Sequence, residues 1–125
     1  MILVDTGVWV DHLRSGNAAL GRLLESAAVL GHPWVTGELC LGNLSRRSEV
    51  IGLLQGLPQA VVASDEEVLG LIDGERLSGT GIGYVDAQLL AATRLTPDAR
   101  LWTGERRLAA VAEHLGVAFA PEPPR

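Results

Sequence analysis

The chain contains no lysine, and all ten of its basic residues are arginines. A P-loop needs a lysine at the phosphates of its nucleotide, a Schiff-base enzyme needs an amine, and a protein kinase needs the lysine of its third strand. The sequence therefore argues against nucleoside triphosphate hydrolysis of the P-loop kind, against pyridoxal chemistry and against kinase chemistry.

Cysteine and long apolar runs are also scarce. The single cysteine, Cys40, can form neither an internal disulfide nor a cysteine-based zinc site, and its apolar neighbours predict a buried packing role. No stretch approaches the roughly 18 apolar residues of a membrane span, and no secretory signal opens the chain. We expect a cytoplasmic protein with no membrane segment, built as one domain over residues 1–120 with a tail over 121–125.

Net charge adds one further restriction. The formal charge of −5 argues against a protein that coats nucleic acid through a basic surface. It leaves open a nucleic-acid enzyme, because acidic side chains that hold a divalent cation reverse the local field.

Apolar runs and helical periodicities alternate along most of the chain, which predicts an α/β fold with a central, mainly parallel sheet covered by helices on both faces. A capping box at Ser64 and Glu67 opens one of the helices. The glycine-rich segment 78–83 is expected to be a flexible loop, since it lacks the lysine of a phosphate cradle. We expect strands over residues 1–4, 28–30, 59–63, 100–103 and 117–120, and helices over residues 8–15, 18–27, 34–44, 48–57, 65–77, 84–95 and 104–115.

Four acidic residues differ from the ordinary surface charges. Asp5 follows the first strand, where the functional edge of a parallel sheet lies. Glu38 stands in an apolar helix and could instead pair with Arg46 or Arg47. Asp86 lies in the first turn of a helix, where it could simply complement the dipole, and Glu105 follows a late strand.

Carboxylates gathered at one sheet edge repel one another, and a hard divalent cation such as Mg²⁺ or Mn²⁺ relieves that repulsion. A cation held in this way can orient a phosphodiester and assist its hydrolysis by water. The four acids therefore predict a metal-dependent phosphodiesterase site.

Four segments of the chain resemble the acidic blocks of the PIN-domain family, in order and at similar spacing. They are ILVDTGVWVDHLR, HPWVTGELCLGNL, GIGYVDAQLLAATRL and LWTGERRLAAVAEHLGV, and they resemble in particular the VapC-type toxins of bacterial toxin–antitoxin pairs. The resemblance implies a three-layer α/β/α sandwich and an Mg²⁺-dependent endoribonuclease. It carries Asp5, Glu38 and Asp86 over as metal-binding acids, while Thr103 and Glu105 match the block of the fourth site.

The resemblance also implies partners, namely an RNA substrate, a second copy of the chain in a homodimer, and a VapB-type antitoxin whose extended segment lies across the site. Two positions depart from the family pattern. Gly7 replaces a small hydroxyl residue, and Glu105 replaces an aspartate. These departures leave open a catalytically weak or inactive module that acts only through association with its partner.

Other residues are candidates for contact with RNA. Arginine side chains can bind phosphate, although salt bridges on solvated helix faces would explain them as well. The three tryptophans stand in apolar stretches and are expected in the core. A serine hydrolase is a poor alternative, because no serine stands in a G-x-S-x-G elbow. The candidates for substrate contact are Thr6, Thr103, Arg46, Arg47, Arg106 and Arg107.

Overall fold

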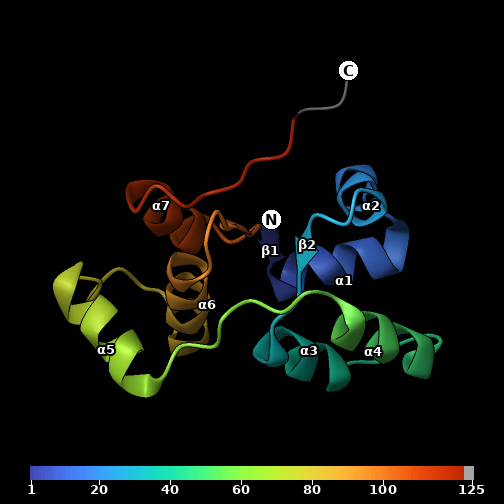
Figure 1. The fold of residues 1–125 in the computed structure, drawn as a ribbon, viewed down its shortest axis with the longest axis horizontal. Helices are drawn as coiled ribbons and strands as arrows, with labels where there is room; N and C mark the ends of the chain where they lie inside the picture. Colours follow the sequence, from blue (N-terminus) through green and yellow to red (C-terminus); the bar gives the residue numbers. More distant parts are fainter. Residues whose placement is uncertain (123–125) are drawn as a thin grey trace.

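The computed structural model describes residues 1–122 of the chain, and groups of consecutive helices separate its short strands, most of all over residues 33–95, although alternation was predicted along most of the chain (Figure 1). Most of the predicted elements are present within two or three residues of their expected ends. The predicted tail over residues 121–125 lies outside the described residues from 123 onward. The elements are β1 (Ile2–Val4), α1 (Thr6–Ser15), α2 (Ala18–Glu25), β2 (Val29–Leu30), α3 (Pro33–Cys40), α4 (Arg47–Gly56), α5 (Asp65–Gly74), α6 (Tyr84–Leu95), β3 (Arg100–Trp102) and α7 (Arg106–His114).

The sheet is parallel, as predicted, and has the order β2-β1-β3. In the register of β1, Leu3 lies opposite Leu30 of β2 and Leu101 of β3. Because β1 occupies the middle of the sheet and is buried along its whole length, its carboxyl end opens directly beside the carboxyl end of β3. This arrangement brings the residues after Val4 next to the residues after Trp102.

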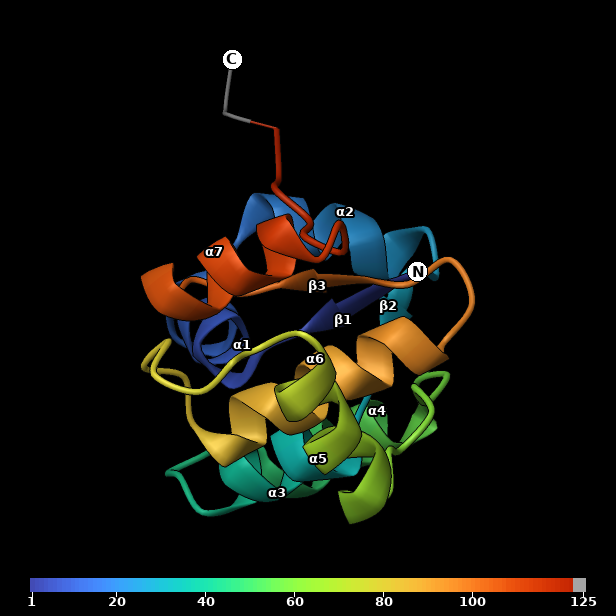
Figure 2. The same ribbon diagram turned by 90° about the vertical axis from the view of Figure 1, so that its left-hand side faces the viewer.

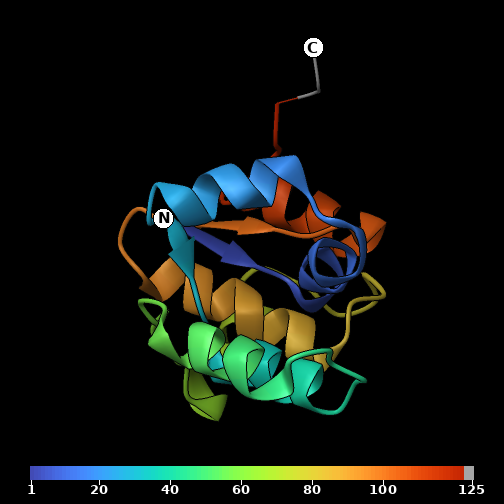
Figure 3. The same ribbon diagram turned by 90° about the vertical axis from the view of Figure 1, so that its right-hand side faces the viewer.

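Helices cover both faces of the sheet, which confirms the predicted three-layer α/β/α sandwich. Figures 2 and 3 show α2 and α7 on one face and α6 on the other, with α3, α4 and α5 on the side of α6. Leu89 and Leu90 of α6 and Leu108 of α7 are fully buried and belong to the same core as β1. Within residues 1–122, no helix combines the length and the apolar character that a membrane crossing requires.

Two predicted strands are wrong, because each is reduced to a single bridge. In the segment 59–63, Ala60 N–H donates to Gly31 O, but the next amide, Val61 N–H, donates to the Thr96 hydroxyl instead of a strand. In the segment 117–120, pairing is confined to the two sides of Leu101, and Pro121 follows with no N–H to extend the ladder. In both segments the residue composition predicted a strand where the structure has a single bridge.

Helix α3 is shorter than predicted. It ends at Cys40 rather than near residue 44, since the Leu41 and Gly42 amides donate to carbonyls three residues back and the chain then turns. Leu41, which follows the end of the helix, is largely exposed. Cys40 is half-buried rather than buried as expected.

The buried ring of His32 caps the start of α3. Its Nδ1 accepts a hydrogen bond from Trp34 N–H at 3.1 Å, and its Nε2 has no partner in the described part of the chain. Burial lowers the pKa of this imidazole, because the interior disfavours the charged form. The folded protein therefore binds a proton at His32 less readily than the unfolded chain does.

Acidification is expected to destabilise the protein through His32. The unfolded chain binds the proton more tightly than the folded one, so the free energy of unfolding should fall as the pH drops below about 6.5, by at most about 1.4 kcal/mol per pH unit from this group. Urea unfolding at a series of pH values measures the slope. In His32→Asn, which keeps a capping side chain without an imidazole, the slope in this window should disappear; a slope that persists would assign it to other groups.

Candidate metal centre

Asp5 lies at the end of β1 and is the N-cap residue of α1. Its Oδ1 accepts from Thr6 N–H at 2.8 Å, and its Oδ2 accepts from the Thr103 hydroxyl at 2.7 Å. Its own N–H donates to Trp102 O at 2.9 Å, and the residue is 6% exposed. A buried carboxylate is thus held in one orientation by the helix start and by the neighbouring strand end.

Asp86 lies in the first turn of α6 and is half-buried. Its Oδ2 accepts from Gly83 N–H at 3.0 Å, so the carboxylate caps its own helix. The preceding loop reaches this position through Gly81, whose φ of +87° favours glycine. A Cβ at Gly81 would lie 2.8 Å from Cδ of Arg107, so the loop is packed against α7.

Glu105 precedes α7, and its N–H donates to the Thr103 hydroxyl at 3.1 Å. Thr103 therefore links the backbone of Glu105 to the carboxylate of Asp5. Oxygen atoms of Asp5, Asp86 and Glu105 all lie within 4.8 Å of one another. The fold thus brings together three of the four acids that the sequence singled out, from the ends of two strands and the start of one helix.

The electrostatics of this cluster are those of crowded negative charges. The pKa of Glu105 is raised, first by partial burial and then by the charges of Asp86, Asp5 and Glu38. The two ion pairs found in residues 1–122, Arg46 with Glu49 and Arg94 with Glu75, involve none of the clustered acids. No arginine partner neutralises the cluster in this part of the chain.

Glu38 is connected to the cluster indirectly. Its Oε1 accepts from the Thr6 hydroxyl at 2.7 Å, and Thr6 is the residue whose amide holds Asp5. The side chain is exposed rather than enclosed by the apolar helix, and it does not form the alternative pair with Arg46 or Arg47. The hydroxyls of Thr6 and Thr103, predicted to contact substrate, are both directed at carboxylates.

The donor set fits a hard divalent cation. Carboxylate oxygens are the preferred ligands of Mg²⁺, and opposite ligands on one such ion are about 4.2 Å apart, so small side-chain rotations would close the cluster around it. A cation would also remove the repulsion that raises the pKa of Glu105.

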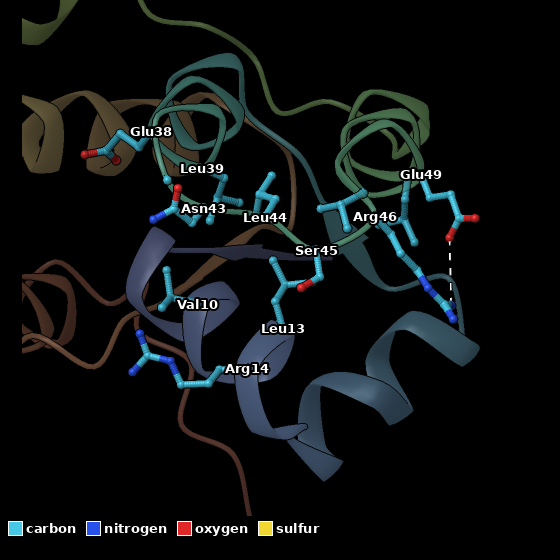
Figure 4. Close-up of a pocket in the computed structure, with 13 residues that line it drawn as sticks. Val10, Leu13, Arg14, Glu38, Leu39, Asn43, Leu44, Ser45, Arg46 and Glu49 are labelled. Carbon is cyan, nitrogen blue, oxygen red and sulfur yellow. Dashed lines mark ion pairs between the residues drawn. The ribbon is translucent and has the colours of Figure 1, made fainter.

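A groove of about 790 Å³ begins at Glu38 and runs between α1 and the segment that joins α3 to α4 (Figure 4). Its floor is apolar, and Arg14 and Arg46 lie at its sides, the latter 4.0 Å from Glu49. Sequence reasoning did not single out Arg14, and no motif marks it. The lining residues are Val10, Leu13, Arg14, Glu38, Leu39, Gly42, Asn43, Leu44, Ser45, Arg46, Glu49, Val50 and Leu53.

The other predicted arginines lie elsewhere. Arg106 and Arg107 are exposed in the first turn of α7, directly after Glu105, and Arg47 is exposed at the start of α4. Of the tryptophans, Trp9 and Trp102 belong to the core as predicted, whereas Trp34 does not and is 36% exposed. Apolar neighbours in the sequence did not show that Trp34, in the first turn of α3, lies on an exposed side of the helix.

Comparison with known proteins identifies relatives that match over nearly the full length of the chain. No protein-family model matches the chain. Ribonuclease VapC32 of Mycobacterium tuberculosis, from strain CDC 1551 / Oshkosh and from strain ATCC 25618 / H37Rv, is 47% identical over 122 residues, which cover 98% of this chain and 98% of the relative. With the α/β/α fold and the clustered acids described above, this identity shows that the chain belongs to the VapC-type toxins of the PIN-domain family.

Proposed function

We propose that the protein is a metal-dependent endoribonuclease toxin. The observation that carries the proposal is the group of carboxylate oxygens of Asp5, Asp86 and Glu105, within 4.8 Å of one another and without a basic partner in residues 1–122. The 47% identical relatives are named ribonucleases, which supports RNA as the substrate.

We assign the cation site to Asp5, Asp86 and Glu105, with Glu38 as a fourth acid that completes it from α3. Asp5 is the anchor, because burial and two hydrogen bonds fix its position. Thr103 and Thr6 are positioning residues, since their hydroxyls hold Asp5 and Glu38. When bound, Mg²⁺, or Mn²⁺ in its place, supplies positive charge at the phosphodiester oxygens and eases the deprotonation of the attacking water.

The exposed arginines would contact the RNA backbone on both sides of the acids. Arg106 and Arg107 stand beside Glu105 at the N-terminus of α7, where the helix dipole also favours a phosphate. Arg46 and Arg47 stand at the start of α4, and Arg46 also lines the groove that begins at Glu38. Phosphates placed between these two arginine pairs would pass over the carboxylates.

The same groove is suited to a VapB-type antitoxin, which would inhibit the nuclease. Val10, Leu13 and Leu39 give it an apolar floor, and its end at Glu38 lies next to the proposed cation site. An extended segment bound there would keep RNA from the acids. From the resemblance to VapC-type toxins we also propose that the protein forms a homodimer.

The test is cleavage of total cellular RNA by the isolated protein. With Mg²⁺ or Mn²⁺ we expect discrete cuts, which should vanish with EDTA and return when excess Mg²⁺ is added, because the carboxylates alone supply no positive charge at the scissile phosphate. Addition of the cognate VapB-type antitoxin should suppress the same cuts. A folded, antitoxin-free protein that binds the cation but leaves all cellular RNA intact would contradict the proposal and favour the inactive binding module.

A further inference from the structure

An exposed pair of aromatic rings lies at the starts of two neighbouring helices. Trp34 is in the first turn of α3 and is 36% exposed, and Tyr84 opens α6 and is 41% exposed. Their ring centroids are 6.2 Å apart, with an angle of 53° between the planes. In a chain with three tryptophans and one tyrosine, this pair presents two flat apolar surfaces to solvent.

The ring pair is carried by the helices that also carry two of the acids. Trp34 and Glu38 are four residues apart in α3 and therefore share one face of that helix. Tyr84 stands two residues before Asp86 in α6. Figure 2 shows α3 and α6 on the same side of the sheet. Trp34 thus lies one helical turn from Glu38, and Tyr84 lies in the same first turn of α6 as Asp86.

A hydrogen bond holds the Tyr84 ring in place before any ligand binds, and a hydrogen bond from the backbone fixes the helix start that carries Trp34. The amide of Trp34 donates to the buried His32 ring, which fixes the start of α3. The Tyr84 hydroxyl donates to Asp65 Oδ1 at 2.7 Å, and Gln88 Nε2 approaches the same hydroxyl at 3.5 Å. A preorganised surface binds a planar ligand with a smaller loss of entropy than a mobile one does.

We propose that Trp34 and Tyr84 form a stacking site for one unpaired base of single-stranded RNA, next to the nucleotide whose phosphodiester lies at the acids. The inference rests on the proposed function, since it deepens the description of the same substrate. Unstacked bases of single-stranded RNA bind to proteins by stacking on aromatic rings, largely independently of their sequence.

The surroundings of the pair favour a base over a protein partner. Carboxylates border the ring pair, since the Tyr84 hydroxyl donates to the exposed Asp65 and the exposed Glu38 lies one helical turn from Trp34. A stable protein interface buries about 800 Å² on each partner and excludes unpaired charge from its centre. A single neutral base needs neither a large contact area nor a surface free of charge, and its phosphate would be directed toward the cation site.

The experiment measures RNA binding separately from cleavage. Asp5→Asn protein, which is expected to leave RNA intact, is titrated in Mg²⁺ into a fluorescein-labelled single-stranded RNA oligonucleotide, and the Kd is read from anisotropy. Adding Trp34→Ala or Tyr84→Ala should raise Kd about 5- to 100-fold, the loss of one stacked base. Trp34→Phe and Tyr84→Phe, which keep a ring, should restore most of the affinity. Leu69→Ala on α5, a matched truncation of an exposed apolar side chain, should leave Kd unchanged.

An abasic nucleotide locates the stacked base. One position of the oligonucleotide should lose affinity when its base is removed, and that loss should be absent in the Trp34→Ala protein. Equal affinity of the alanine and parent proteins for RNA would overturn the proposal. If the alanine protein also had a changed molecular mass by light scattering, the rings would belong to an interface between copies. Wild-type protein that fails to cleave RNA while the Trp34-dependent binding persists would contradict only the proposed nuclease activity.

Discussion

Asp5→Asn is expected to reduce metal-dependent RNA cleavage by at least about 100-fold, the upper end of what loss of an outer-shell partner costs at a metal site. Asparagine keeps the volume and can still accept from Thr6 N–H, so the N-cap of α1 survives. It removes the negative charge from the most buried member of the cluster. Initial rates on a defined RNA, with Mg²⁺ in excess, measure the effect.

The same variant separates loss of function from loss of fold. Without a divalent cation, removal of one of several crowded charges offsets the weakened hydrogen bond from Thr103, and the free energy of unfolding should stay within about 1 kcal/mol of wild type. Saturating Mg²⁺ should raise the melting temperature of the wild type but not of the variant, because a ligand that binds only the folded state stabilises it.

Asp73→Asn is the matched control. It makes the same chemical change at an exposed carboxylate of α5, outside the cluster, and should keep wild-type cleavage and the wild-type response to Mg²⁺. If Asp5→Asn retained full activity, or if Asp73→Asn lost activity equally, the acidic cluster would not be the catalytic site.

The edge of the sheet where the acids meet was predictable from local sequence, because a buried parallel strand ends in a definite place. The four apolar residues before Asp5 fixed the end of β1, and the run before Thr103 fixed the end of β3. Parallel strands with adjacent ends bring such residues together whatever the details of packing. The clustering of Asp5 and Glu105 therefore follows from the position of β3 next to β1 in the sheet.

Contacts that depend on side-chain direction could not be predicted in this way. Glu38 accepts from Thr6 across 32 residues of sequence, and no local pattern shows that its side chain faces solvent at the edge of the cluster. The segment around Val61 has strand composition, but its amide is taken by a threonine hydroxyl from a distant turn. Strand pairing depends on tertiary contacts, so local composition alone did not predict that it would be absent.

Trp9→Ala is expected to destabilise the protein by about 3–5 kcal/mol, a large part of the roughly 5–15 kcal/mol that holds a domain of this kind folded. Trp9 is 1% exposed, packs edge-on against the His12 ring at a centroid distance of 6.2 Å, and lies in the helix that Asp5 caps. Its truncation leaves a cavity under α1. Urea unfolding monitored by circular dichroism measures the change.

Trp34→Ala makes the same substitution at a different depth. Its ring is partly exposed and lies tilted against Tyr84, so its loss should cost less than that of Trp9, about 1–2 kcal/mol including the aromatic pair. Equal losses for the two variants would mean that Trp34 is buried in solution, and the stacking site proposed above would then have no exposed ring to offer. A large difference between the two shows that tryptophans with similar apolar neighbours in the sequence serve different ends: Trp9 stabilises α1, and Trp34 remains free to bind a ligand.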